Sequence, residues 1–278
     1  MTGIGASAGW AENAAGAGLR SPAWTELWRA RELIGFFAQR DLKVRYKQAV
    51  LGVVWVLLQP IATVAAFTLV FDRLAGVSSQ GIPYPLFALT GLITWTYFSS
   101  TVSRASTVLV GDSALITKVY FPRLAAPAGA VLPPLVDLGV SLVLAAVLML
   151  VYGASPSWTL LALPVWLLLL VLTALGVSLW LSALNVRYRD VQQATVPLLQ
   201  LWLFLSPVAY PSTLLTGWHR LVFALNPMTG VIELGRWSML GAPWPGWPLA
   251  ISAGTAAVVL VGGVRYFRRA ERGFADVI

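Results

Sequence analysis

Long apolar runs alternate with short polar segments over most of the chain. Six of these runs carry almost no charge: Leu51–Phe71, Leu86–Ser103, Leu124–Tyr152, Leu160–Leu184, Val191–Tyr210 and Leu249–Phe267. Each is near or above the roughly 18–20 residues that a helix needs to cross about 30 Å of hydrocarbon. The pattern therefore predicts an all-α membrane protein with six transmembrane helices.

The basic residues fall largely on one side of this arrangement. Six spans place both termini on the same side, and of the 19 Lys and Arg residues only Arg73, Arg220 and Arg236 lie on the opposite side. Because loops rich in Lys and Arg stay in the cytoplasm, both termini are predicted to be cytoplasmic and the chain to be a multi-pass protein of the plasma (inner) membrane. The net charge of +8 is spread over successive cytoplasmic junctions, which favours membrane lipids over nucleic acid as partners.

The sequence before the first span divides into two segments. Residues 1–23 are small, polar and rich in Gly and Ala, and are predicted to be a disordered cytoplasmic tail rather than a signal peptide. Residues 24–278 are predicted to form a single transmembrane domain. It begins with residues 24–47, an amphipathic helix in the cytoplasmic interface, for which a plain charged anchor is the alternative. Its apolar face consists of Leu27, Ala30, Ile34, Phe37 and Ala38.

Two apolar pieces between the fifth and sixth spans are too short to cross a membrane. Thr213–Leu225 and Met228–Leu240 are separated by Asn226-Pro227 and followed by the turn-rich string GAPWPGWP. They are predicted to be re-entrant or interfacial helices on the external side. If one of them crossed instead, the arginines near the C-terminus would lie outside, which the positive-inside rule disfavours.

Several kinds of catalytic site are excluded by residues that the chain lacks. It contains no Cys, a single histidine (His219), no phosphate-binding loop and no Asp-x-Asp pair or cluster of carboxylates. These absences argue against a catalytic triad, a metal site and ATP binding through a phosphate loop. The chain is therefore predicted not to be an enzyme and to hold no cofactor of its own.

Two kinds of residue inside the spans are candidates for function. Asp137 lies in the third run, where an ionisable group is costly and often functional, although a structural hydrogen bond to a neighbouring span is the alternative. Aromatic residues also lie within the spans and could stack on sugar rings, by analogy with other aromatic contacts, although each alone could face lipid or belong to the interfacial belt. The candidate channel aromatics are Trp55, Trp95, Tyr97, Phe98, Trp202, Phe204 and Tyr210.

Several long strings resemble, in order, the type-2 ABC exporter permeases that carry O-antigens, teichoic acids and capsular polysaccharides. They are RDLKVRYKQAVLGVVWVLLQP, LITKVYFPRLAAPAGAVLPPLVD, LNVRYRDVQQA, LWLFLSPVAYP and ALNPMTGVIELGRW, and the match covers nearly the whole chain after the tail. The resemblance implies a homodimer of six-span subunits enclosing a channel. It also implies two copies of a separate ABC ATPase below the membrane, which bind the ATP and Mg²⁺.

The resemblance further implies two contacts with the ATPase and an external gate. Residues 113–123 look like the coupling helix, residues 185–190 like a second contact, and residues 211–240 like the external gate helices. The implied coupling residues are Leu115, Ile116, Lys118, Tyr120, Phe121, Arg187 and Arg189.

Arg45, Tyr46 and Lys47 resemble the lateral entrance at which a lipid pyrophosphate headgroup would be received. Two cations and a hydroxyl at the cytoplasmic interface suit such an anion. The alternative is that Arg45 and Lys47 are only positive anchors.

The leading hypothesis is the membrane subunit of an ATP-driven exporter of lipid-linked polysaccharide. Two other classes are alternatives. An ABC permease for a small hydrophobic molecule is one, because fold alone does not fix the substrate. A membrane-embedded glycosyl or acyl transferase is the other, and the absence of catalytic groups argues against it.

Overall fold

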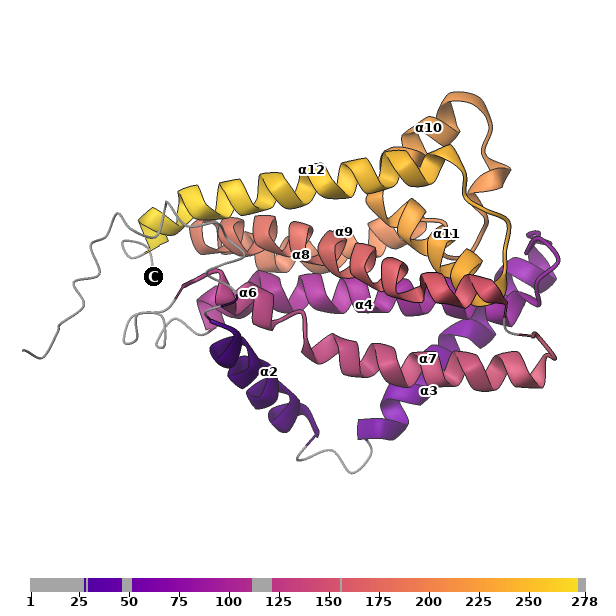
Figure 1. Cartoon of the computed structure of the whole chain (residues 1–278), viewed down its shortest axis with the longest axis horizontal. Coiled ribbons are helices and arrows are strands. Elements are labelled where there is room, and N and C mark those ends of the chain that lie inside the picture. Colours follow the sequence, from indigo (N-terminus) through magenta and orange to yellow (C-terminus); the bar gives the residue numbers. More distant parts are fainter. Residues whose placement is uncertain (1–27, 29, 47–51, 112–121, 156, 275–278) are drawn as a thin grey trace, which may run out of the picture.

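The computed structural model describes residues 28, 30–46, 52–111, 122–155 and 157–274. These residues form a helical bundle with no strand among them, which confirms the predicted all-α class for this part of the chain. The long helices lie side by side along the long axis of the molecule, and α2 crosses obliquely at one end (Figure 1). In chain order the elements are α2 (Arg31–Tyr46), α3 (Gly52–Phe67), the π-helix η2 (Thr68–Leu74), α4 (Tyr84–Gly111), α6 (Ala125–Gly129), α7 (Pro133–Val151), the 3₁₀ helix η3 (Trp158–Ala162), α8 (Leu163–Arg187), α9 (Asp190–Phe204), η4 (Ser212–Leu214), α10 (Gly217–Leu225), α11 (Pro227–Leu240), α12 (Trp247–Ala270) and η5 (Glu271–Gly273).

Three stretches of the described helices are long and apolar enough to cross a membrane. They are Ala125–Val151, Trp158–Arg187 and Trp247–Ala270, which correspond to the third, fourth and sixth predicted spans. The helix of the first run changes to a π-helix at Thr68, and α4 is long but carries Arg104 with many Ser and Thr residues. With 15 residues, α9 is about 22 Å long, shorter than the hydrocarbon layer. That the chain has six transmembrane spans therefore stays a prediction.

The centre of the bundle is α4. It contacts α3, α7, α8, α9 and α11, and in Figure 1 it runs through the middle of the molecule. Phe87, Phe98 and Leu109, spaced along its length, are completely buried. Because its neighbours surround it, α4 is the element on which the other helices are positioned.

The closest packing of two long helices joins α8 and α12 through glycines. A Cβ built on Gly176 would lie 2.9 Å from the Cα of Leu260, and one on Gly263 would lie 2.7 Å from the carbonyl oxygen of Gly176. One turn further along α8, Trp180 donates from Nε1 to the carbonyl of Val259 at 3.0 Å. Small residues that allow helix backbones to approach closely are typical of helix packing within membranes. Because lipid tails are themselves apolar, the hydrophobic effect contributes little to helix association there.

The two short pieces between the fifth and sixth runs form α10 and α11, as predicted. Asn226 lies between them and caps α11, since its Oδ1 accepts a hydrogen bond from the backbone N–H of Met228 at 3.0 Å. α11 packs against α4, α8 and α12 and is largely buried, whereas α10 keeps Trp218, Val222 and other large apolar side chains exposed. Whether these helices act as a gate is not determined by the packing, and that role stays a prediction.

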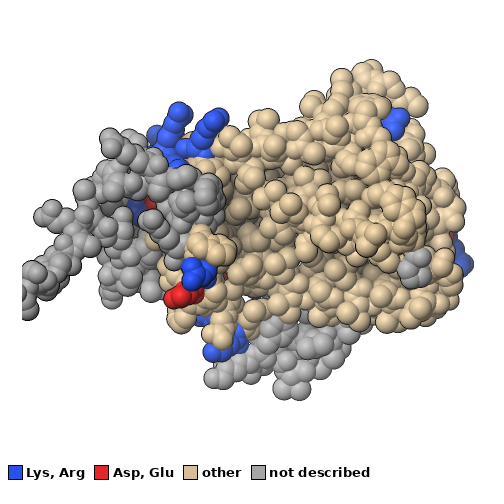
Figure 2. All heavy atoms as spheres, viewed as in Figure 1, with Lys and Arg blue, Asp and Glu red and all other residues tan. Residues whose placement is uncertain are grey.

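Charged side chains gather at the two ends of the bundle. In Figure 2 the middle of the visible face carries none among the described residues. The end that holds α2, α6 and the last turn of α12 in Figure 1 carries most of the described basic side chains: Arg31, Arg40, Lys43, Arg104, Arg123, Arg187, Arg189, Arg265, Arg268 and Arg269. The opposite end carries Arg73, Arg220 and Arg236. This polarity matches the distribution expected if the first end faces the cytoplasm.

Candidate functional site

The first candidate site lies where α2 meets the bundle. The apolar face predicted for this helix is the one that is packed: Phe37 and Ala38 are buried, and a Cβ on Gly129 of α6 would lie 3.3 Å from the Cβ of Phe37. The helix therefore rests on protein along this face, while Phe36 on another face stays exposed. This packing fixes the position of the charged residues on the rest of the surface of α2.

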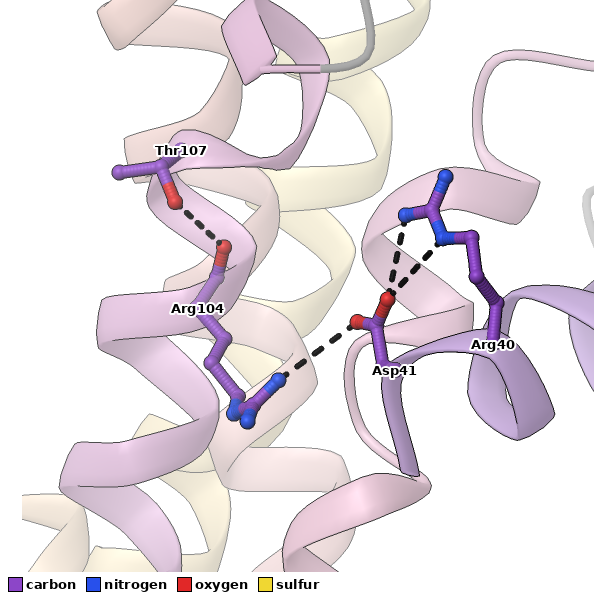
Figure 3. Close-up of polar contacts among 4 residues, drawn as sticks. All are labelled: Arg40, Asp41, Arg104 and Thr107. Carbon is purple, nitrogen blue, oxygen red and sulfur yellow. Dashed lines mark hydrogen bonds and ion pairs between the residues drawn. The ribbon is translucent and has the colours of Figure 1, made fainter. Parts of the chain in front are cut away.

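Those charges form an ion-pair cluster that bridges α2 and α4 (Figure 3). Arg40 approaches Oδ1 of Asp41 with Nε at 3.2 Å and Nη2 at 3.1 Å. Oδ2 of the same carboxylate lies 3.5 Å from Nη1 of Arg104 on α4. Two guanidinium groups thus share one carboxylate. These three side chains therefore carry one excess positive charge, and they lie partly exposed at the end of the bundle that holds α2.

The predicted entrance residues continue the same segment. Arg45 and Tyr46 are the last residues of α2, and Arg45 follows Asp41 by one helical turn, whereas Lys47 lies outside the described residues. Arg104 was not among the sequence-predicted site residues, because no spacing along the chain relates it to α2. Its position in a polar stretch of an otherwise apolar run is the one signal that could have drawn attention to it.

Most of the predicted channel aromatics are packed together inside the helical bundle. Phe98 and Trp95 on α4 lie 5.4 Å apart by ring centroids, and Phe98 lies 5.1 Å from Trp202 on α9, edge to face. Tyr97 is also buried and donates its hydroxyl to the carbonyl of Val131 at 3.3 Å. Contacts of this kind stabilise helix packing, so in the described conformation these side chains are part of the core. Their role as channel aromatics stays a prediction, and the side chain of Trp55 lies outside the described part.

Phe204 differs from this cluster because it is 62% exposed. It belongs to an exposed stripe on α9 with Gln193, Pro197 and Gln200, which follow one another at helical spacing. The buried residues of α9, Thr195 and Leu199, lie on the opposite side of the helix. Two amides and an aromatic ring are therefore exposed together, on the side of α9 that faces away from the core. We call these four residues the α9 stripe.

The last of the predicted aromatics, Tyr210, lies in the turn that follows α9. Its hydroxyl donates to the carbonyl of Phe204 at 2.7 Å, so it closes the end of the helix next to the α9 stripe.

Asn226 connects the end of α9 to α11. Besides capping α11, its Oδ1 accepts from Nε1 of Trp202 at 3.0 Å, and its Nδ2 donates to the carbonyl of Leu205 at 3.0 Å and to the hydroxyl of Ser206 at 2.9 Å. A single amide thus satisfies polar groups from three segments. The sequence pointed to Asn226-Pro227 only as a helix boundary and gave no sign of this bridging role.

The predicted ATPase contacts are described only in part. Residues 113–121, which include Leu115, Ile116, Lys118, Tyr120 and Phe121, lie outside the described residues. Arg187 and Arg189 are exposed in the turn between α8 and α9, at the same end of the bundle as α2.

Asn185, at the start of the second predicted ATPase contact, is buried instead. Its Nδ2 donates to the carbonyl of Ser106 at 2.8 Å, and its Oδ1 accepts from the N–H of Gln192 at 3.2 Å. This amide therefore joins α4, α8 and α9, and the surface available to a partner in this turn begins after it.

Asp137 lies in the second turn of α7, beyond the break that separates α6 from α7. It is half-buried, and its backbone carbonyl accepts the hydroxyl of Ser141 at 2.8 Å. The helix break places Asp137 close to a helix start rather than in the middle of an unbroken helix. Its functional role stays a prediction.

Comparison with known proteins identifies the family of the chain. Residues 32–240 match the family described as ABC-2 type transporter. The O-antigen export system permease protein RfbA of Myxococcus xanthus is 34% identical over 257 residues, which cover 91% of this chain and 98% of that protein.

More distant relatives extend the same comparison. RfbA of Klebsiella pneumoniae is 25% identical over 89% of this chain and 95% of its own length. The polysialic acid transport protein KpsM of Escherichia coli is 25% identical over 84% of this chain and 91% of its own length. The matched residues include nearly all of α2, the α9 stripe, Asn226 and α11, and the chain belongs to the ABC-2 type transporter family.

Proposed function

We propose that the chain is the membrane subunit of an ATP-driven exporter that moves lipid-linked polysaccharide out of the cytoplasm. It works as a homodimer around a channel, with two copies of a separate ATPase. The relatives whose names include O-antigen export and polysialic acid transport support a saccharide substrate. The observation that carries the proposal is the α9 stripe, because of the chemistry that it exposes.

A lipid-facing position would be unfavourable for the α9 stripe. Gln193 and Gln200 are both exposed on one side of an apolar helix. Transfer of an amide from water into hydrocarbon without a hydrogen-bond partner costs on the order of several kcal/mol. Facing a second copy of the chain across an aqueous channel, the same amides would meet water and sugar hydroxyls. Phe204 would add a flat face on which a sugar ring can stack.

The end that carries α2 supports the position of the ATPase. The last turn of α4, the start of α6 and the exposed turn between α8 and α9 all lie at this end (Figure 1). Arg123, the last residue of the predicted coupling helix, donates from Nη1 to the carbonyl of Glu271 at 2.7 Å. A movement of the coupling segment would therefore be transmitted to the end of α12 as well as to α4.

The cluster of Arg40, Asp41 and Arg104 supports a headgroup site beside Arg45, Tyr46 and Lys47. A pyrophosphate offers several anionic oxygens, and arginine binds such groups with paired N–H donors. Asp41 already occupies one side of both guanidiniums in the described structure. The arriving headgroup would compete with this carboxylate for Arg104.

Six spans with both termini in the cytoplasm are part of the proposal, and the absence of Cys from the chain makes the topology directly testable. Ser155, in the exposed turn between α7 and α8, changed to Cys should react in intact cells with a thiol reagent that does not cross membranes. Tyr188→Cys, in the exposed turn between α8 and α9, should react only in inside-out vesicles. Labelling of Tyr188→Cys from outside would refute the arrangement.

Export by the chain reconstituted with its ATPase in liposomes tests the proposal. Gln200→Leu combined with Phe204→Leu removes one amide and one stacking face, and should lower export of lipid-linked glycan roughly tenfold, since each such contact is worth about 0.5–1.5 kcal/mol. Leu198→Ala is the control, because Leu198 is also exposed on α9 but lies off the stripe. Normal export by the double variant would refute a conduit along α9.

A second candidate function is a permease for a small hydrophobic molecule. It is favoured by an apolar cavity of about 430 Å³ between α3, η2, α4 and α7, whose lining includes Val64, Leu69, Leu89, Leu144 and Leu148. This size falls within the range of small-ligand sites. Leu144→Trp would fill the cavity, so it should abolish transport if this function is the correct one and leave glycan export nearly unchanged if it is not.

A further inference from the structure

At the end of the bundle opposite α2, a small polar cavity lies beside α11. It has a volume of about 40 Å³ and is bounded by the segment that follows α9, by α10 and α11, and by the loop before α12. Its polar lining includes Gln80, Ser212, Arg220, Glu233 and Arg236, with Trp244 among its apolar residues. Neither the proposed conduit nor the proposed entrance uses these residues.

Arg236 is the most deeply buried charge in this wall, with 2% of its surface exposed. Nε donates to the carbonyl of Phe87 at 3.3 Å, and Nη2 donates to the carbonyl of Val208 at 2.5 Å. The guanidinium also lies over the ring of Phe87, with Cζ 3.5 Å from the ring centroid. Nη1 has no hydrogen-bond partner within the described part of the chain.

Arg220 adds a second positive charge to the same wall. It lies against the ring of Trp247, with Cζ 5.4 Å from the centroid, and its buried Nε likewise has no partner among the described residues. Both of these N–H groups are therefore buried without a hydrogen-bond acceptor. Burying an unpaired donor of a charged group is energetically unfavourable.

Glu233 does not supply the missing acceptor. Its Oε1 accepts a hydrogen bond from the N–H of Ser212 at 3.3 Å. No ion pair joins Glu233 to Arg220 or Arg236 among the residues that the structure describes. With two guanidiniums and one carboxylate, the wall of the cavity carries one excess positive charge.

From this geometry we propose that the cavity is a binding site for a small monovalent anion. The anion accepts a hydrogen bond from Nη1 of Arg236, pairs with Arg220 and balances the charge that Glu233 leaves uncompensated. The volume is about three times the roughly 10–15 Å³ that one water molecule requires, so the cavity holds a halide or a single carboxylate group. The bound anion would join α10, α11 and the segment after α9.

The same chemistry can come from two sources. One is a free halide such as chloride. The other is the carboxylate of an acidic sugar, for which the exposed ring of Trp244 at the cavity offers a stacking face. The test separates these sources, and it measures binding rather than transport, so its outcome does not depend on the proposed export function.

Thermal unfolding of the full chain in lipid nanodiscs provides the first test. Chloride replaces methanesulfonate at constant ionic strength, and in a second series free of halide, glucuronate replaces methanesulfonate, with glucose as the neutral control. Saturable binding should raise the unfolding midpoint by about 2 °C or more at a concentration several times the Kd. A response to chloride alone would identify the free halide, and a response to glucuronate but not to glucose would identify the acidic sugar.

The effect should require the cavity. Arg220→Gln, at a partly exposed position, should abolish most of the shift. Arg73→Gln removes a charge at the same end of the bundle but outside this cavity and should keep the shift. A midpoint that follows ionic strength alone, or an equal shift in Arg220→Gln, would overturn the proposal and leave a cavity filled by water.

A second measurement uses the unmodified chain. Crystals grown in bromide should show an anomalous scattering peak within hydrogen-bond distance of Nη1 of Arg236 if the halide is the ligand. In crystals grown with glucuronate, electron density for a carboxylate at the same position would identify the sugar acid. Empty or water-sized density under both conditions would overturn the proposal independently of any variant.

Discussion

Two apolar helices that look alike in sequence, α4 and α9, differ sharply in their surroundings. α4 is buried along most of its length by its neighbouring helices, whereas Thr195 and Leu199 are the only described residues of α9 that are buried. The difference indicates separate tasks. α4 supports the helical bundle, and α9 exposes the α9 stripe on the surface of the bundle.

The residue types explain the difference. α4 carries small residues such as Gly91 and Ala105 where its neighbours approach, and small residues permit close contact between membrane helices. α9 instead carries Gln193 and Gln200 on its exposed side. Apolar character is common to both helices, and the small residues of α4 and the amides of α9 distinguish the packed helix from the exposed one.

The largest expected effect is at Gly91 of α4. An added Cβ would lie 2.8 Å from Nη2 of Arg236 and 2.8 Å from the carbonyl oxygen of Val208, so a larger residue must displace α11 or the segment after α9. Gly91→Val should lower the free energy of unfolding by about 3 kcal/mol. Thermal unfolding in detergent measures the loss.

Gly139→Val on α7 is the matched control, because nothing lies within 4 Å of a Cβ added there. It should change the unfolding midpoint much less than Gly91→Val does. If both variants unfold alike, the tight packing of α4 against α11 is not what stabilises the protomer.

The next effect concerns the polar connection of α9. Asn226→Ala removes the cap of α11 and the hydrogen bonds to Trp202, Leu205 and Ser206, and should lower the free energy of unfolding by about 2–3 kcal/mol. Asn226→Asp keeps the acceptor for Met228 and Trp202 but loses both N–H donors, so it should fall between Asn226→Ala and the unmodified chain. Equal stability of all three proteins would mean that α9 is held in some other way.

The aromatic residues provide a third test, which compares the two helices directly. Phe98→Leu on α4 removes a tilted ring contact with Trp95 and an edge-to-face contact with Trp202 inside the core and should cost about 1–2 kcal/mol of stability. Phe204→Leu on α9 changes an exposed ring and should alter stability by less than about 0.5 kcal/mol. Unfolding midpoints of the two variants in the same detergent decide the matter, and a greater loss for Phe204→Leu would contradict the distinction drawn between α4 and α9.

Much of this fold was predictable from the sequence, because it follows from periodicity. The apolar stretches Ala125–Val151, Trp158–Arg187 and Trp247–Ala270, the packed face of Phe37 and Ala38, and the short helices on either side of Asn226 depend on local spacing, and the described residues show them. The side on which an aromatic residue is packed depends on neighbours distant in sequence, so Trp95, Tyr97 and Phe98 could not be recognised as core residues. The same limit applies to the Arg104 contact with Asp41, which joins residues 63 positions apart.

The smallest expected effect is at the junction of α2 and α4, and it is the most specific. Asp41 pairs with Arg40 and Arg104, but all three side chains are partly exposed, and exposed ion pairs contribute only about 0.2–1 kcal/mol. Asp41→Asn should therefore change stability very little.

If a pyrophosphate headgroup must displace this carboxylate from Arg104, the same variant should lower the substrate concentration that gives half-maximal stimulation of the ATPase by roughly 1.5-fold to fivefold. Arg45→Ala should have the opposite sign and raise that concentration about tenfold, since a charge-assisted hydrogen bond is worth about 1.5–3 kcal/mol. ATPase activity of the reconstituted complex, titrated with lipid-linked glycan, measures both changes. An Asp41→Asn variant that binds its substrate more weakly would show that the carboxylate positions the guanidiniums rather than competing for them, and the headgroup would then have to be received without displacing Asp41.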